Sequence, residues 1–347
     1  MFLVVRVGIN GFGTIGKRIA AAVSKQPDMT LIGVTKATPD YKAWFAKKYN
    51  YPLFTAVPEK MEDFKKAGIE VEGTVEDLIS QADVMVDCSP DKVGAKNKET
   101  FYLPKNKKAI FEGGEKAPVA DVSFVSLCNY DEGVGKNYIR CVSCNTTGLV
   151  RSLYAVDKAF GIERVIATMV RRSADPPEIK KGPINAIVVD PPTLPSHHGP
   201  DVKTVMSHID ITTFAVKVPT TISHLHCVAA DLKNEATTGE VIDVFAKSPR
   251  IILVSAEKGI RSTAEVIEFA RDLGRPRNDL YELAIWLESV KVENKTLYFF
   301  QAVHQEAIVV PNNIDAIRAI TNTTAKEESI FLTNKTLEIL ESGIYPS

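Results

Sequence analysis

The sequence has 347 residues, of which 45% are hydrophobic and 24% are charged, and its formal net charge is -1 at pH 7. A chain of this length is too long for one small core and fits two domains. The near-neutral charge gives no field that would favour nucleic acid or an anionic membrane as a partner. No apolar run approaches the roughly 18 residues that a membrane span needs.

The apolar start of the chain, residues 1–5, lacks the basic leader of a signal peptide, and Arg6 and several glycines follow it. This segment is therefore predicted to be a strand. The five cysteines are odd in number and spread from Cys88 to Cys227, which does not fit the disulfide framework of a secreted protein. These features favour a cytoplasmic enzyme with reduced thiols.

The first 143 residues alternate apolar strand segments with helical patterns, which is typical of a parallel sheet with crossover helices. Thr74 and Asp77 have the spacing of a capping box that opens a short helix. Several predicted strands end in small or polar residues, as expected where the carboxyl ends of parallel strands form a ligand crevice. The predicted strands are residues 4–9, 31–34, 84–88, 109–111 and 122–127.

The pattern changes near residue 143. A strong helical pattern follows, with Leu149, Leu153, Val156 and Phe160 on one face, and it ends at Gly161. Longer β-like segments follow, which predict a mostly antiparallel sheet in a second domain, with a hairpin turn centred on Asn294. The chain closes with a helix that Asn312 or Asn313 can cap, in which Ile314, Ile317 and Ile320 share a face. The β-like segments are residues 164–172, 210–218, 224–232, 283–290 and 296–303.

A glycine-rich loop, Gly11-Phe12-Gly13-Thr14-Ile15-Gly16, lies between the first predicted strand and a helix. In this context the glycines permit a tight turn and the close approach of a pyrophosphate, whose charge sits at the helix N-terminus. The sequence therefore predicts that this chain binds a nicotinamide dinucleotide. The contacts are expected from Gly11, Gly13, Thr14, Ile15 and Gly16.

The end of the second predicted strand bears on which dinucleotide is bound. An NAD-specific site usually places Asp or Glu there, about 20 residues after the loop, to accept hydrogen bonds from the ribose hydroxyls. Here the stretch contains Thr35 and Lys36, and no carboxylate precedes Asp40. A hydroxyl and an ammonium group suit a 2′-phosphate, so NADP is expected to be accepted as well as NAD.

Cys144 stands at the N-terminus of the helix predicted to end at Gly161. The positive end of a helix dipole favours the thiolate, and the backbone N–H groups of the first turn can receive an oxyanion. A thiolate, a hydride acceptor and oxyanion donors are the parts required to oxidise an aldehyde through a thioester.

The stretch around this cysteine resembles the active-site signature of the glyceraldehyde-3-phosphate dehydrogenase family. Four further stretches resemble the archaeal-type branch of that family, in the family's order and over nearly the whole chain. The five stretches are Ser143-Cys144-Asn145-Thr146-Thr147-Gly148-Leu149, Ile9-Asn10-Gly11-Phe12-Gly13-Thr14-Ile15-Gly16-Lys17-Arg18, Pro195-Ser196-His197-His198-Gly199-Pro200-Asp201, Val218-Pro219-Thr220-Thr221 and His304-Gln305-Glu306.

The resemblance implies an α/β protein with a doubly wound Rossmann cofactor domain at residues 1–143 and an α+β catalytic domain at residues 144–305. It implies that residues 306–347 form a helical segment that packs back on the cofactor domain. The family is typically a homotetramer.

The resemblance also implies the reaction. In the family a cysteine adds to D-glyceraldehyde 3-phosphate, hydride passes to the nicotinamide, and inorganic phosphate releases 1,3-bisphosphoglycerate, in glycolysis or gluconeogenesis. Cys144 matches this cysteine. A histidine activates the thiol and takes a proton. His224 is its best match by spacing, and His226, on the same face of the predicted strand, stays open as the alternative.

Two anions must be held, the substrate phosphate and the attacking phosphate. Arg171 and Arg172 should face opposite sides of a strand, and the resemblance favours Arg172, with contacts to substrate and cofactor. His198 and Gly199 match the family's substrate-binding pair. The remaining residues expected at the substrate are Ser143, Asn145 and Thr146, and those expected at the cofactor are Gly113, Gly114 and Gln305.

Other interpretations of the function remain open at this point. A related oxidoreductase, such as aspartate-semialdehyde dehydrogenase, shares the fold and the cysteine chemistry. A cofactor-sensing protein without turnover would not need Cys144. The spacing of Cys141 and Cys144 also fits a dithiol or half a zinc site, but the sequence has no second cysteine pair to complete four ligands, and no metal is predicted.

Overall fold

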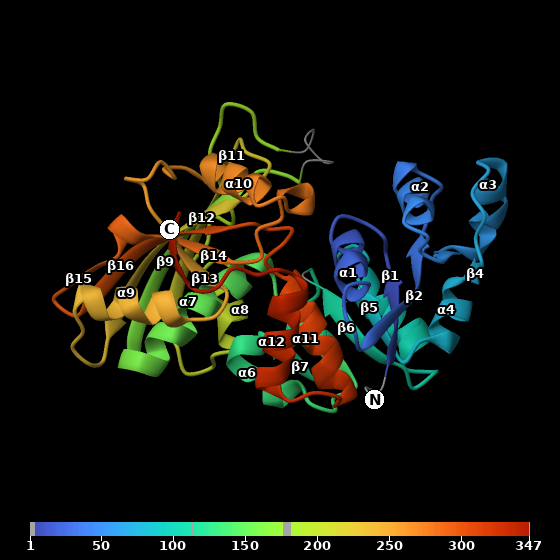
Figure 1. Ribbon diagram of the computed structural model, residues 1–347, viewed down its shortest axis with the longest axis horizontal. Helices are drawn as coiled ribbons and strands as arrows, with labels where there is room; N and C mark the ends of the chain where they lie inside the picture. The colour runs from blue at the N-terminus through green and yellow to red at the C-terminus, as the bar shows by residue number, and fades with distance from the viewer. Residues whose placement is uncertain (1–3, 113, 176–181, 347) are drawn as a thin grey trace. The chain divides into compact units, whose positions relative to one another are not determined.

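The computed structural model describes residues 4–112, 114–175 and 182–346, and the chain divides into two compact units (Figure 1). Unit 1 comprises residues 1–143 and 309–338, and unit 2 comprises residues 144–308 and 339–347. The segment expected at 306–347 is therefore shared between the units. Its end forms β17 (Gly343–Tyr345), which pairs with β13 (Ile251–Val254) of unit 2.

Unit 1 contains a parallel sheet of eight strands among the described residues, in the order β4-β3-β2-β1-β5-β6-β8-β7. All its pairings are parallel. The order runs outward in both directions from β1, so the sheet is doubly wound. In such sheets a ligand binds at the carboxyl ends of the strands where the order reverses, which here are β1 and β5. The strands are β1 (Val5–Asn10), β2 (Met29–Lys36), β3 (Leu53–Thr55), β4 (Gly73–Thr74), β5 (Val84–Asp87), β6 (Lys108–Glu112), β7 (Val122–Phe124) and β8 (Tyr138–Cys141).

Two helices of unit 1, α4 and α11, test predictions made from the sequence pattern. Thr74 forms the predicted capping box with Asp77 at α4. Ile314, Ile317 and Ile320 are fully buried along α11, as their spacing predicts. The predicted asparagine cap is wrong, because α11 begins at Val310. The helices are α1 (Gly16–Val23), α2 (Tyr41–Lys48), α3 (Met61–Lys66), α4 (Val75–Gln81), α5 (Val93–Asn97), α6 (Ser126–Gly133), α11 (Val310–Thr321) and α12 (Lys326–Thr336).

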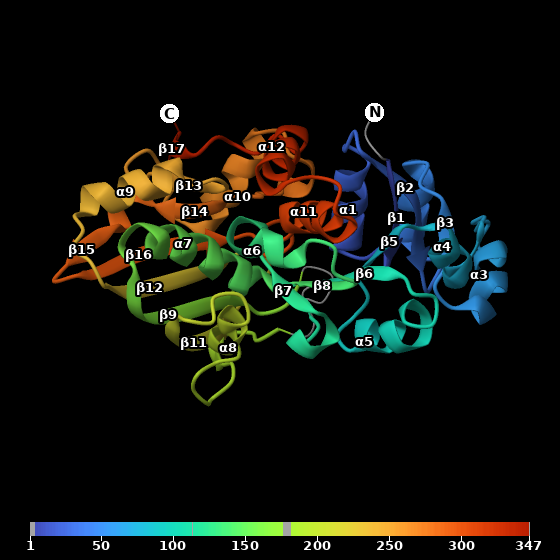
Figure 2. The same ribbon diagram turned by 90° about the horizontal axis from the view of Figure 1, so that it is seen from below.

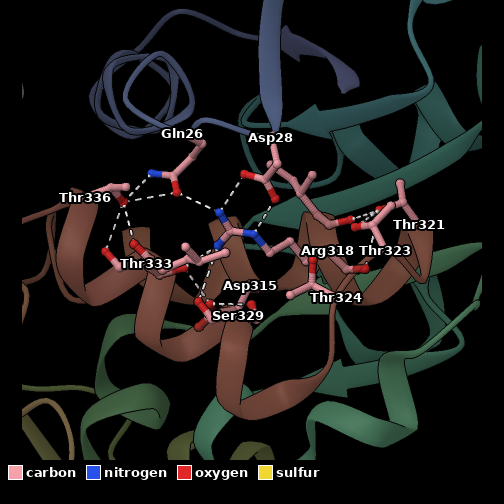
Figure 3. Close-up of polar contacts among 12 residues, drawn as sticks. Gln26, Asp28, Asp315, Arg318, Thr321, Thr323, Thr324, Ser329, Thr333 and Thr336 are labelled. Carbon is pink, nitrogen blue, oxygen red and sulfur yellow. Dashed lines mark hydrogen bonds and ion pairs between the residues drawn. The ribbon is translucent and has the colours of Figure 1, made fainter. Parts of the chain in front are cut away.

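A buried ion pair ties α11 and α12 to the turn between α1 and β2 (Figure 3). The Arg318 guanidinium donates to both carboxylate oxygens of Asp28, at 2.7 and 2.8 Å, and to Gln26 and Thr333. The Thr333 hydroxyl donates in turn to Asp315. We call these residues, with Ser329, the Arg318 cluster. Because every polar group is paired, a full charge is accommodated in the core of unit 1.

Unit 2 contains a nine-stranded mixed sheet among the described residues, in the order β10-β11-β9-β12-β16-β14-β13-β17, with β15 beside β16. The pairings around β12 and β16 are antiparallel, as predicted, whereas β9 with β11 and β13 with its two neighbours are parallel. The other strands are β9 (Ile162–Arg172), β10 (Val188–Val189), β11 (Asp210–Val218), β12 (His224–Leu232), β14 (Leu283–Trp286), β15 (Lys291–Glu293) and β16 (Thr296–Val303).

The predicted hairpin is present, but its first strand is β15, because the strand predicted over 283–290 ends at Trp286 in a short 3-10 turn. Asn294 and Lys295 form the two-residue connection with φ of 48° and 65°. Two consecutive left-handed residues match the right-handed twist of the flanking strands.

One face of the unit 2 sheet is covered by α7 (Cys144–Phe160), which packs along β9, β12 and β16 (Figures 1 and 2). Side chains alternate across each strand, so every second residue of these strands faces the helix. The other helices of unit 2 are α8 (His198–Lys203), α9 (Thr238–Lys247) and α10 (Thr263–Asp272). In the part of the chain that the structure describes, no helix is long and apolar enough to cross a membrane.

Candidate active site

The glycine loop of unit 1 has the geometry that a dinucleotide requires. Gly11 has a φ of +107°, and a Cβ added at Gly16 would lie 1.9 Å from the carbonyl oxygen of Gly11, so neither position accepts a side chain. A Cβ at Gly13 would meet nothing within 4 Å. The loop is thus closed tightly by its outer glycines and open at its middle one, which fits the close approach of a phosphate to the backbone.

Thr35 lies beneath this loop and is fully buried. Its hydroxyl accepts a hydrogen bond from the Gly11 N–H at 2.9 Å and donates to the Asn10 side chain at 2.7 Å. The Asn10 amide continues to Asp87, which also accepts from the Tyr102 hydroxyl at 2.6 Å. Thr35 therefore holds the loop in shape, and Asn10 connects it to Asp87 at the end of β5, a residue that the sequence motif does not reveal.

Lys36 lies at the end of β2, where the sequence places it, but it is paired. Its ammonium nitrogen is 2.8 Å from a carboxylate oxygen of Asp40, which also caps α2 by accepting from the Lys42 N–H. A carboxylate is therefore present at the end of β2 even though the sequence motif lacks one.

The other predicted cofactor residues of unit 1 lie close to the loop or to the end of β6. The carbonyl of Thr14 accepts from the Arg18 guanidinium at 2.9 Å, and Ile15 precedes α1. The N–H of Gly114 donates to the carbonyl of Glu112. Gly113 lies outside the described residues. Glu112 itself is buried, which raises its pKa to about 8 although Asn313 donates to it.

In unit 2, the Cys144 thiol and the His224 ring face each other. Cys144 is the first residue of α7, and its Sγ lies 3.6 Å from Nε2 of His224 on β12. The backbone N–H of Arg172 donates to Nδ1 of the same ring at 3.1 Å. Burial, followed by the charges of neighbouring histidines and arginines, holds the pKa of His224 well below its usual range. The neutral ring must therefore carry its proton on Nε2, the nitrogen that faces the sulfur.

His226 lies on the same face of β12, as predicted, but both of its ring nitrogens are occupied. Nε2 is 2.9 Å from Oδ1 of Asn145, and Nδ1 is 2.9 Å from the amide nitrogen of Gln301. All three side chains are buried. The structure thus brings His224, and not His226, to the thiol.

His198 and Gly199 are also internal. The His198 ring bonds to the Asn145 amide at 3.2 Å and to the Ser196 hydroxyl at 3.0 Å, and its side chain is 1% exposed. The N–H of Gly199 donates to the hydroxyl of Thr213. The predicted substrate-binding pair therefore lies in a buried polar network that reaches Asn145, the residue after Cys144.

Arg171, rather than the expected Arg172, lies on the face of β9 that His224 and Met169 share. The sequence establishes only that the two arginines point to opposite sides; the pairing of β9 with β12 decides which side faces α7. Burial lowers the pKa of Arg171, while Asp190 and Cys144 oppose this shift, so its charge acts on the thiol. Its guanidinium bonds to Asp190. Arg172 forms an ion pair with Asp175 instead.

Three further predicted residues have defined positions. Thr146 is buried in α7 and donates to Asp201 at 2.5 Å. Ser143 immediately precedes α7 and is partly exposed. The Gln305 amide accepts from the Ser223 N–H and donates to the Thr221 carbonyl, so it fixes the loop that leads into β12.

The sequence did not reveal Ser196, Thr213 or Gln301. Gln301 could have been found, because it falls in the buried phase of β16, between Phe299 and Val303, where a polar residue needs a partner. Cys141 and Cys144 form no disulfide, and neither do the other three cysteines, all of which lie in the described residues.

Comparisons with known proteins agree with this arrangement. The family model "Glyceraldehyde 3-phosphate dehydrogenase, C-terminal domain" matches residues 143–275, and the model "Dihydrodipicolinate reductase, N-terminus" matches residues 5–111. The chain is 56% identical over 346 residues to the glyceraldehyde-3-phosphate dehydrogenase of Methanopyrus kandleri, covering 97% of this chain and 98% of that protein.

Two more relatives carry the same name. The protein of Archaeoglobus fulgidus is 56% identical over 335 residues, covering 96% of this chain and 98% of the relative. The protein of Pyrococcus furiosus is 54% identical over 337 residues, covering 97% of this chain and 99% of the relative. With the Rossmann-type sheet of unit 1, these matches support a nicotinamide cofactor. The chain belongs to the glyceraldehyde-3-phosphate dehydrogenase family, in its archaeal type.

Proposed function

We propose that this protein oxidises D-glyceraldehyde 3-phosphate, with inorganic phosphate and NADP or NAD, to 1,3-bisphosphoglycerate in the cytoplasm. The observation that carries the proposal is the Cys144 thiol at the start of α7, 3.6 Å from the proton-bearing nitrogen of His224. The names of the relatives support the choice of substrate.

Cys144 is the nucleophile in this proposal. The N-terminus of α7 and the charge of Arg171 both favour its thiolate. The thiolate forms a C–S bond with the aldehyde carbon, and the carbonyl oxygen becomes an oxyanion. The Nε2–H of His224 and the N–H groups of the first turn of α7 donate hydrogen bonds to this oxygen.

In the proposed reaction His224 acts as a hydrogen-bond donor in every step. The family resemblance implies a histidine that takes a proton, but the Arg172 N–H bond to Nδ1 keeps the proton of the neutral ring on Nε2. The adduct on Cys144 therefore keeps its negative charge on oxygen and needs no base before it becomes a thioester. A bound nicotinamide supplies the hydride acceptor. Cys144 leaves as a thiolate when phosphate attacks the thioester.

Arg171 is the best candidate for holding the phosphate groups. It lies on the same sheet face as His224, and Lys217 is its partner on the neighbouring strand β11. Both cations contact Asp190, which fixes their positions. An Arg171→Lys variant should raise the KM for phosphate more than it lowers kcat, since a lysine keeps the charge but loses the planar fork.

Lys36 supports the use of NADP. The open middle of the glycine loop fits a pyrophosphate, and an ammonium group at the end of β2 can meet a 2′-phosphate. Because Asp40 already pairs with Lys36, we propose that NAD is also accepted. Lys36→Ala should raise the KM for NADP and leave that for NAD nearly unchanged; equal effects on both would contradict the assignment.

A homotetramer is supported by the sheet face of unit 2 that α7 does not cover. Ile166, Phe214, Tyr298 and Phe300 lie on this face and are 40–46% exposed. Adjacent exposed apolar side chains of this kind mark an association surface. Light scattering coupled to gel filtration should give four times the chain mass, and a Phe300→Asp variant should give a smaller particle.

The test of the whole proposal is a spectrophotometric assay of cofactor reduction with glyceraldehyde 3-phosphate. Reduction should require phosphate, should occur with either cofactor, and should be lost in a Cys144→Ser variant. Aspartate semialdehyde serves as the comparison substrate. Turnover of the semialdehyde but not of the sugar phosphate would reverse the substrate assignment.

A further inference from the structure

A chain of five buried side chains joins Asn145, the neighbour of Cys144, to strands β12 and β16, to the start of α8 and to the segment before α8. The Gln301 amide bonds to Nδ1 of His226, and Nε2 of the same ring bonds to Oδ1 of Asn145. The Asn145 amide nitrogen bonds to Nε2 of His198. Nδ1 of His198 then bonds to the Ser196 hydroxyl. The donor–acceptor distances lie between 2.9 and 3.2 Å. We call these five residues the histidine relay.

The bonding pattern fixes the protonation of both rings. The Gln301 amide nitrogen can only donate, so His226 accepts at Nδ1 and donates from Nε2 to Asn145. The Asn145 amide nitrogen then donates to His198, which must carry its proton on Nδ1. Reversing both amides reverses every bond together, and the rings are again neutral with one proton each. An imidazolium at either position would place a donor against a donor.

The surroundings also favour neutral rings. Burial, and then the charge of Arg171, lowers the pKa of His226 to about 3. Burial, followed by the charges of His197, Arg171 and His226, lowers the pKa of His198 to about 2. The other titratable groups that face the relay are His224 on β12, Cys144 on α7 and Asp201 on α8. In the described residues, no carboxylate bonds to either ring.

An amide is the one side chain that suits the centre of this relay. It accepts from one ring with its oxygen and donates to the other with its nitrogen, which neither a carboxylate nor an ammonium group can do. Asn145 is 2% exposed and belongs to the first turn of α7, directly after Cys144. Clamping this amide on both sides therefore fixes the turn that carries the thiol.

We propose that His226 and His198 are positioning residues that act through Asn145, as two permanently neutral rings that hold the first turn of α7 and keep titratable charge away from the Cys144 thiol. The proposal rests on the proposed function only in taking Cys144 as the reactive thiol.

The first test compares two replacements of His226 in the full-length protein. In His226→Gln, the amide can donate to Asn145 from the position of Nε2 without titrating; in His226→Leu, the bond is lost but the volume is kept. The readout is the rate of alkylation of Cys144 by iodoacetamide as a function of pH, without cofactor or substrate, with Cys144→Ser as the background for the other thiols. We expect the glutamine variant to match the wild type and the leucine variant to react about 10-fold more slowly. Equal rates in the two variants would refute positioning through Asn145.

The second test changes the centre of the relay. An Asn145→Asp carboxylate only accepts, so one of the two rings must gain a proton to restore the bonds. The wild-type alkylation profile should show one ionisation and the Asn145→Asp profile two. One unchanged ionisation in the variant would overturn the claim that the amide keeps the rings neutral.

The two tests remain separate from the proposed function. Alkylation needs no turnover, so an altered profile in a protein that fails to oxidise glyceraldehyde 3-phosphate supports the relay and rejects the substrate. Circular dichroism and thermal unfolding show whether each variant is folded. If Asn145→Asp does not fold, the His226 pair decides the proposal alone.

Discussion

The Arg318 cluster of unit 1 and the histidine relay of unit 2 are both buried polar networks, but one is ionic and the other neutral. Arg318 is fully buried and meets a carboxylate through two parallel hydrogen bonds (Figure 3). His198 and His226 are equally buried, but they meet amides and a hydroxyl. A charge persists in a protein interior where a counter-charge and a full set of hydrogen bonds meet it, and a titratable ring without a counter-charge stays neutral.

The two networks also join different parts of the fold. The Arg318 cluster links helices α11 and α12 to the α1–β2 turn and contains no predicted site residue, so its role is stability. The histidine relay ends on the residue after Cys144, so a change in it should reach the thiol. The comparison therefore predicts that the first network affects unfolding and the second affects reactivity as well.

Removal of the arginine should have the largest effect. Arg318→Met leaves the Asp28 carboxylate buried without its partner, which should lower the free energy of unfolding by about 3–5 kcal/mol. Denaturant unfolding of the variant measures this loss, and Cys144 alkylation in the folded fraction should be unchanged.

The matched control is the double variant Arg318→Met with Asp28→Leu. Replacing both charges by apolar groups removes the unpaired carboxylate, so much of the lost stability should return. If the double variant were as unstable as the single one, the ion pair would be stabilising in its own right and the comparison with the neutral relay would need revision.

The second-largest effect is expected from lowering the pH, which should reduce the folding stability that the neutral His226 ring contributes. The folded-state pKa of His226 is about 3, below the usual value of about 6.5 for the unfolded chain. The unfolded state therefore binds more protons between these values. The stability that the neutral ring contributes is complete above pH 6.5 and is lost as pH falls toward 3, at roughly 1.4 kcal/mol per pH unit.

The measurement is denaturant unfolding of the wild type and of His226→Gln at pH 7 and at pH 4.5. Groups remote from His226 titrate equally in both proteins, so the difference between them reports this ring together with His198 and His224, whose pKa values His226 lowers. The variant should lose less stability on acidification. A parallel loss in the two proteins would show that His226 is already charged or is exposed in the native state.

The features that the sequence predicted correctly are local. The glycine loop and the helix beginning at Cys144 depend on residues within about one turn of each other, where backbone geometry and helix capping act. The shared face of His224 and His226 follows from strand alternation alone. These features needed no knowledge of the tertiary structure.

The features that the sequence missed depend on partners distant in the chain. Alternation separates Arg171 from Arg172 but does not say which faces the thiol, because strand pairing decides it. Thr35, His198 and Gln305 are all predicted site residues, yet they bond to groups 24, 53 and 82 residues away, respectively. The burial of a polar side chain and its partner are properties of the packed fold.

The smallest predicted effects come from removing one hydroxyl group from each network. Thr333 and Ser196 are both fully buried, and each hydroxyl bonds to two side chains: Arg318 and Asp315 for the first, His198 and Thr213 for the second. Thr333→Val and Ser196→Ala should therefore cost similar stability, about 1–2 kcal/mol each in denaturant unfolding.

The two variants should differ at the thiol. Ser196→Ala removes the acceptor of the His198 ring proton, which loosens the clamp on Asn145 from one side, so Cys144 alkylation should slow about 2- to 3-fold. Thr333→Val should leave the alkylation rate unchanged at equal loss of stability. Because stability is matched, a slower rate in Ser196→Ala alone can only come from the path through His198 and Asn145. Equal rates in both would mean that the relay beyond Asn145 acts as packing, as the Arg318 cluster does.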